Sequence, residues 1–175
     1  MARYLLSSRT VLDIIQRKGE PGEAWLAAAA AQRDVIARDL CISAVTPMAV
    51  RRELNRRIAL IQAGTPDPDF SHDDLIQMGR NAEALFREYG AEDRIVPMTA
   101  SIATRWGELL DQKINYVDSE DREYPIGSVQ KLEIATAIVG RNDIPYVYVE
   151  REQKAHAGLN GLVVEDPTRP AGQNA

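Results

Sequence analysis

Four arginines gather in one short stretch of the sequence. They are Arg51, Arg52, Arg56 and Arg57. Cations at this spacing along a helix could contact the phosphates of a nucleic acid. The same spacing is typical of a solvated helix face, on which arginines pair with acids such as Glu53. Because no aromatic side chains that could stack on bases are interleaved among them, we favour the solvated face.

Two acidic stretches could be mistaken for metal sites. Asp118–Glu123 crowds its acids around one arginine, but it lacks the glycine and the terminal glutamate of an EF-hand loop, so we expect a solvated loop. His72–Asp74 stands at a predicted helix start, where acids interact favourably with the helix dipole. Cys41 is the only cysteine and the chain has two histidines, which excludes an internal disulfide and a Cys-rich zinc site.

The composition is that of a soluble globular protein. The chain has 175 residues, of which 45% are hydrophobic and 27% are charged, so a largely disordered chain is excluded. The net charge of −5 argues against nucleic-acid binding driven by bulk charge, although a local basic face remains open. No apolar run reaches the roughly 18 residues that span a bilayer, so we expect no membrane association and a cytoplasmic location.

Short apolar runs alternate with segments of helical periodicity. The runs predict strands at 3–6, 40–43, 94–97, 145–149 and 162–164. Helices are predicted around Val11–Ile15 and Glu23–Arg38, and from Thr46, Ser71, Thr99 and Ser128 onward. Thr46, Ser71 and Ser128 are expected to serve as caps. This alternation predicts an α/β fold with a mostly parallel sheet.

The functional crevice of such a fold lies at the carboxyl ends of the strands. In this sequence those ends are Ser7–Arg9, Ser43–Thr46 and Glu150–Glu152, joined by the helix start Ser128–Glu133. We expect a single domain over residues 1–166 and a flexible tail over residues 167–175.

Several stretches, in this order, resemble the PIN domains and in particular the VapC-type toxin ribonucleases. The stretches are Tyr4–Leu12, Ile42–Arg52, Arg94–Pro97, Ala103–Glu108, Leu132–Ala137 and Tyr146–Leu159. Leu132-Glu-Ile-Ala-Thr-Ala137, for example, is similar to the Asp-Ala-Leu-Ile-Ala-Ala-Thr-Ala of that family. The resemblance covers most of residues 3–166 and implies a three-layer α/β/α domain with a short central sheet.

The resemblance also implies a chemistry, metal-dependent hydrolysis of a phosphodiester, in which clustered acids hold Mg²⁺ or Mn²⁺. Four acidic positions of the family carry neutral residues in this chain. They are Ser7, Ala49, Gln130 and Ala155. The asparagine of the first turn is replaced by Arg9, and only Glu152 is still acidic. We therefore expect no catalytic residues of the family type and no metal cofactor.

Acids that have moved by about one helical turn are the alternative source of a metal site. Asp13, Glu53 and Glu133 stand near the lost positions, and Glu152 would complete the set. A shift of ~5 Å is rarely tolerated by strongly positioned ligands. Glu133, between two apolar residues, is also typical of a solvated or ion-paired helix position. Tyr146 and Tyr148 are interpreted as packing residues and Cys41 as inert.

Two functions of different classes follow. The first is a catalytically degenerate PIN-like module that binds a protein or a nucleic acid at the former crevice. Its candidate binding residues are Arg9, Arg51, Arg52, Arg56 and Glu152. The second is a divergent Mg²⁺- or Mn²⁺-dependent endoribonuclease that uses the relocated acids. The resemblance further implies a homodimer, and an antitoxin whose basic tail would meet an arginine, Arg9, in this crevice.

Overall fold

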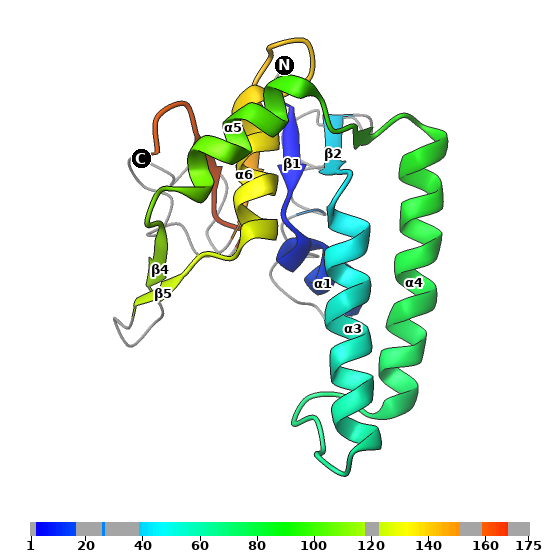
Figure 1. Cartoon of the computed structure of the whole chain (residues 1–175). Helices are drawn as coiled ribbons and strands as arrows, with labels where there is room; N and C mark the ends of the chain where they lie inside the picture. Colours follow the sequence, from blue (N-terminus) through cyan, green and yellow to red (C-terminus); the bar gives the residue numbers. More distant parts are fainter. Residues whose placement is uncertain (1–2, 17–25, 27–38, 118–122, 151–158, 168–175) are drawn as a thin grey trace.

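A computed structural model describes residues 3–16, 26, 39–117, 123–150 and 159–167 (Figure 1). Its centre is a parallel five-stranded sheet with the strand order β3-β2-β1-β6-β7. The strands are β1 (Tyr4–Leu6), β2 (Leu40–Ser43), β3 (Ile95–Val96), β6 (Val147–Val149) and β7 (Val163–Glu165). A parallel sheet is normally covered on both faces, which is why β1 and β2 are continuous apolar runs and fully buried.

β1 holds the central place because it pairs with a strand on each side. Leu5 lies opposite Cys41 in β2 and opposite Tyr148 in β6. Successive side chains of a strand point to opposite faces, so Leu5 and Leu6 belong to different hydrophobic cores. The carboxyl end of β1 consequently lies in the middle of the sheet edge, with the ends of β2 and β6 beside it.

Helices cover both faces of the sheet. They are α1 (Ser8–Gln16), α3 (Thr46–Gln62), α4 (His72–Ala91), α5 (Ala100–Leu110) and α6 (Ser128–Val139). The first three pack with Leu6 in one core, and α5 and α6 pack with Leu5 in the other. The long helices α3 and α4 lie side by side and extend well beyond the sheet (Figure 1). The predicted three-layer α/β/α arrangement with a parallel central sheet is therefore confirmed.

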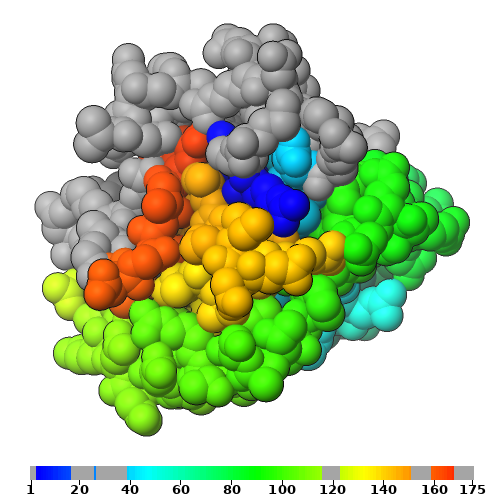
Figure 2. Space-filling view, turned by 90° about the horizontal axis from the view of Figure 1, so that it is seen from above, coloured from blue at the N-terminus to red at the C-terminus, as the bar shows by residue number. Residues whose placement is uncertain are grey.

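The two ends of the sheet differ. From the end at which the strands begin, the turn after α6 covers the centre of the molecule, flanked by α5 (Figure 2). At the opposite end, α1, α3 and α6 all begin close to the strand ends (Figure 1). The part of the chain that the model describes contains no helix that is long and apolar enough to cross a bilayer.

Some local predictions are confirmed and others are wrong. Ser71 forms a complete capping box with Asp74, as predicted, and α5 begins directly after Thr99, whose hydroxyl caps it. The predicted caps Thr46 and Ser128 are instead the first residues of α3 and α6, and neither helix has a side-chain cap.

Two short antiparallel strands that the sequence does not predict lie at 115–117 and 123–125, and the loop predicted at 118–123 lies, apart from Glu123, outside the described residues. The strands are β4 (Asn115–Val117) and β5 (Glu123–Pro125). Because the exposed β5 has no apolar alternation, it gives no strand signal in the sequence. The helix predicted at 23–38 lies, apart from Leu26, outside the described residues, as does the tail from 168 onward.

Candidate functional site

One acidic side chain lies at the centre of the sheet edge, and it comes from α6. Glu133 is 1% exposed, and its carboxylate reaches the first residues of two other helices. The backbone N–H of Ser8 and the hydroxyl of Thr46 donate to Oε1, at 3.0 Å and 2.9 Å. The hydroxyls of Ser8 and Tyr148 donate to Oε2, at 3.3 Å and 3.2 Å. Glu133 thus joins α6 to the beginnings of α1 and α3 and to β6.

The protonation of Glu133 is shifted by this burial. Desolvation, which penalises the charged form, raises its pKa to about 7. The hydrogen bonds from Thr46 and Tyr148 oppose the shift, whereas the charge of Glu150 adds to it. Burial beside Glu133 also raises the pKa of Tyr148 well above its ordinary value, so its hydroxyl stays a donor. The protonated form of Glu133 is therefore favoured at a higher pH than in a solvated glutamate.

A second buried acid, Glu150, follows directly after β6. It is 1% exposed, and the guanidinium of Arg9 lies 4.0 Å from its carboxylate. Arg9 is the second residue of α1, so both charges belong to the same edge of the sheet as Glu133. A cation of the protein itself thus stands beside Glu150, in the turn at which the family resemblance places a metal ligand.

Ser7 closes β1 and caps the helix that follows. Its hydroxyl accepts from the backbone N–H of Thr10 at 3.0 Å and donates to the Thr10 hydroxyl at 3.0 Å. Thr10 in turn donates to the carbonyl of Val149 at 2.9 Å. Both hydroxyls are buried, so they fasten α1 to β6. An aspartate at position 7 would be the first metal ligand of the family, whereas the serine here serves as a helix cap.

The other positions at which the resemblance expects acids are neutral and differ in their surroundings. Ala49 lies one turn into α3 and Gln130 one turn into α6, and both are partly exposed. Ala155 and Glu152 lie outside the described residues. Among the residues whose placement is given, no group of three or more His, Cys, Asp or Glu side chains could hold a metal ion.

The three relocated acids that the structure describes, Asp13, Glu53 and Glu133, do not form a group that could hold a metal ion. Glu53 accepts from Arg56 and Arg57, and these hydrogen bonds lower its pKa to about 2. Asp13 is buried in α1. Glu133 lies at the sheet edge but is fully buried, so the solvated or ion-paired position expected from the sequence is wrong. The physical reason is that four donors converge on it from segments distant in sequence.

The arginine cluster on α3 divides into two pairs. Arg56 and Arg57 pair with Glu53, as expected for a solvated helix face. Arg51 and Arg52 instead line a groove of about 840 Å³ between α3 and α4. Arg9 does not line this groove, so the arginines suggested as one binding surface belong to separate places.

The sequence reasoning missed the hydroxyl groups that surround Glu133. Tyr148, taken as a packing residue, is fully buried but uses its hydroxyl on Glu133. Thr46, taken as a cap, does the same. The available signal was the polar residue type of both at predicted strand and helix ends near the crevice. Cys41 is buried, and burial raises the pKa of its thiol, as suits an inert residue.

Comparison with known proteins gives a likeness in structure alone. No protein-family model matches the sequence. No curated protein matches it either. Among solved structures, the fold is similar to the crystal structure of VapBC2 from Rickettsia felis bound to a DNA fragment from its promoter. The TM-score is 0.54 and the identity 14%, over 93% of this chain and 97% of the other. This likeness shows a PIN-like fold.

Proposed function

We propose that this chain is a catalytically silent PIN-like domain that works as a binding module. The observation that carries the proposal is the state of Glu133, whose two carboxylate oxygens are both occupied by protein donors. A carboxylate that is fully buried and has a pKa of about 7 is a poor ligand for a hard cation, because the proton competes with the metal.

The residues around Glu133 do not fit a divalent cation. Mg²⁺ needs one or two carboxylates with free lone pairs, and Ser7 and Gln130 offer only neutral oxygens. The Arg9 guanidinium would oppose a nearby cation by roughly 4 kcal/mol at ~4 Å and an effective dielectric of ~20. In this proposal the pair Arg9–Glu150 balances charge at the sheet edge without a metal.

A macromolecular partner is suggested by the structural neighbour. VapBC2 is bound to a promoter DNA fragment in its crystal. For the present chain the net charge of −5 disfavours nucleic acid as the bulk partner, so we favour a protein. The homodimer implied by the family resemblance remains part of the proposal.

One observation favours a nuclease as the second candidate. A glutamate with a raised pKa beside a second buried acid is typical of catalytic sites, and Glu133 and Glu150 form such a neighbourhood. In that case Glu133 would act as an acid or base with Glu152 as a metal ligand. The two candidates differ in whether the wild-type chain binds Mn²⁺ and cleaves RNA.

Isothermal titration with MnCl₂ up to millimolar concentration, together with cleavage of a structured RNA, separates the two. The comparison variant returns the family residues to the described sheet edge. It carries Ser7→Asp, Arg9→Asn, Ala49→Glu and Gln130→Asp. Circular dichroism establishes that it is folded.

We expect no Mn²⁺ heat and no cleavage for the wild-type chain, and measurable Mn²⁺ binding for the folded variant. Tight Mn²⁺ binding by the wild type that Glu133→Gln or Glu152→Ala abolishes would contradict the proposal. RNA cleavage that depends on Mn²⁺ and is lost in the same variants would establish the nuclease instead.

A further inference from the structure

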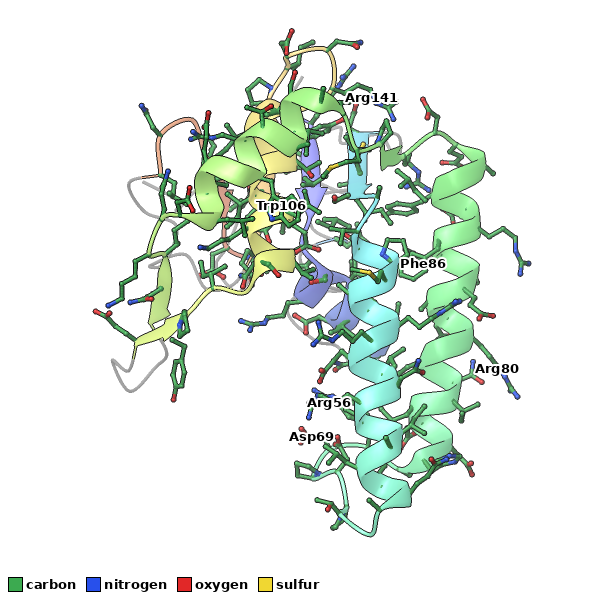
Figure 3. The ribbon with its side chains drawn as sticks, viewed as in Figure 1. Arg56, Asp69, Arg80, Phe86, Trp106 and Arg141 are labelled. Atoms are coloured by element: carbon green, nitrogen blue, oxygen red, sulfur yellow. The ribbon has the colours of Figure 1, made fainter. Side chains whose placement is uncertain are left out.

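The groove between α3 and α4 combines apolar and basic side chains. Its apolar part includes Pro47, Met48 and Phe86. Its basic part is formed by Arg51, Arg52 and Arg87. Phe86 lies between the two helices (Figure 3). The groove is therefore amphipathic, with side chains of both kinds supplied by each helix.

The groove continues into a second hollow along the same two helices. This hollow has a volume of about 220 Å³ and shares Arg51, Asn55 and Phe86 with the first. Its own lining adds apolar side chains, among them Ile58 and Ile76. Met48 is 54% exposed and Ile76 38%, so apolar area lies open along this face. Helices of partner proteins dock in grooves of this kind through apolar residues spaced three to four apart.

Of the three arginines in the groove, one has an acidic partner and two do not, among the residues that the structure describes. Arg51 lies 3.3 Å from Glu83, and both side chains are largely exposed. Arg52 and Arg87 form no ion pair with any residue that the model describes, whereas Arg56, further along α3, is paired with Glu53. The groove thus has a positive excess within an acidic chain, and its complement is an acidic surface.

We propose that the groove between α3 and α4 binds an acidic amphipathic helix of a partner protein. Apolar side chains of that helix contact Met48 and Phe86, and its carboxylates pair with Arg52 and Arg87. The inference rests on the proposed function, because it names the surface and the partner of the binding module. Nucleic acid is disfavoured because Phe86 is the single aromatic residue of the lining and the groove also presents apolar side chains such as Pro47 and Met48.

A peptide-display library panned against the full chain tests the inference without knowledge of the natural partner. Enriched peptides are synthesised and their affinities measured by fluorescence anisotropy. The test variants are Arg52→Glu and Arg87→Glu, and the matched control is Lys113→Glu, an exposed lysine after α5 that lines neither hollow. A uridine oligonucleotide serves as the nucleic-acid probe.

We expect enriched peptides with acids beside apolar residues, and affinity that falls about tenfold or more in each test variant but not in the control. Changing one acid of the peptide to lysine should restore binding to Arg87→Glu. The inference is overturned by no enrichment, by affinity that both test variants leave unchanged, or by the oligonucleotide displacing the peptides. Such outcomes leave the proposed function standing, since Mn²⁺ binding and RNA cleavage test it separately.

Discussion

The carboxyl group of Glu133 accepts the hydrogen bonds that connect most of the elements at the candidate site. In α6, Glu133 is flanked by Leu132 and Ile134. An apolar side chain in its place could be buried without the cost of removing a charge from water. An apolar residue would leave the backbone N–H of Ser8 without this acceptor. The neutral acid combines both requirements, because it accepts from Ser8 and satisfies the hydroxyl of Thr46 without a buried charge.

The raised pKa makes the stability of the fold depend on pH. The pKa of Glu133 is about 7 in the folded chain against 4.5 ordinarily, so the folded state holds the proton more tightly. Its contribution to stability is fully present below pH 4.5 and is lost as the pH rises to about 7. The loss is roughly 3 kcal/mol of the free energy of unfolding. Glu133→Gln, which keeps the shape and the neutral state, should abolish it.

Urea unfolding at a series of pH values between 4.5 and 8 measures this effect. We expect the free energy of unfolding of the variant to rise relative to that of the wild type between pH 4.5 and about 7, and the difference to level off above that. Glu53→Gln is the matched control, because its partners lower the pKa of Glu53 to about 2, so its charge is constant over the same range. Parallel pH profiles for the wild type and Glu133→Gln would contradict the assignment of the buried proton.

For the candidate site, the sequence identifies which residue types stand at the expected positions, but not the contacts that these residues make. The neutral residues Ser7, Ala49 and Gln130 are visible by comparison with the family pattern. The contacts around Glu133 are not visible in the sequence, since Ser8 and Glu133 are separated by 125 positions. Spacing along a helix reports neighbours one turn away, whereas the direction of a buried carboxyl is decided by tertiary packing.

At the helix ends, too, some side-chain contacts are determined by nearby residues and others by tertiary packing. Ser71 with Asp74 and the hydroxyl of Thr99 cap their helices through atoms three residues away, so the local sequence predicts them. Thr46 has the residue type of a cap, but its hydroxyl donates to the distant Glu133. At the start of α6 the cap position is occupied by Gly127, which has no side chain to accept a bond.

These observations predict different costs for two equal substitutions. Ser71→Ala removes a hydroxyl that accepts from the backbone N–H of Asp74, and it should lower the free energy of unfolding by about 1 kcal/mol. Ser128→Ala, at the first residue of α6, should change it by less than ~0.5 kcal/mol. Thermal unfolding of both variants checks this. Equal losses would mean that Ser128 is a cap after all.

For the whole molecule, the alternation of strands and helices predicted an α/β fold with a mostly parallel sheet, and the family resemblance implied its three layers. The sequence did not predict the order β3-β2-β1-β6-β7, because each strand is a short apolar run without a mark of its neighbour. β1 is shared by both cores through Leu5 and Leu6, which ties the α1–α3–α4 layer to the α5–α6 layer. This shared strand favours unfolding of both layers as one unit.

Substitutions that create a small cavity on each face of the sheet test whether the two layers unfold as one unit. Ile15 belongs to the core beneath α1 and Ile102 to the core beneath α5, and both are buried. Each change to valine should cost about 0.5–1.5 kcal/mol, and the double variant should lose the sum to within ~0.5 kcal/mol. Each substitution should lower the midpoint of a single urea unfolding transition. Circular dichroism and tryptophan fluorescence should report the same transition. Two transitions with separate midpoints, each moved by only one of the substitutions, would show that the layers unfold independently and that β1 does not couple them.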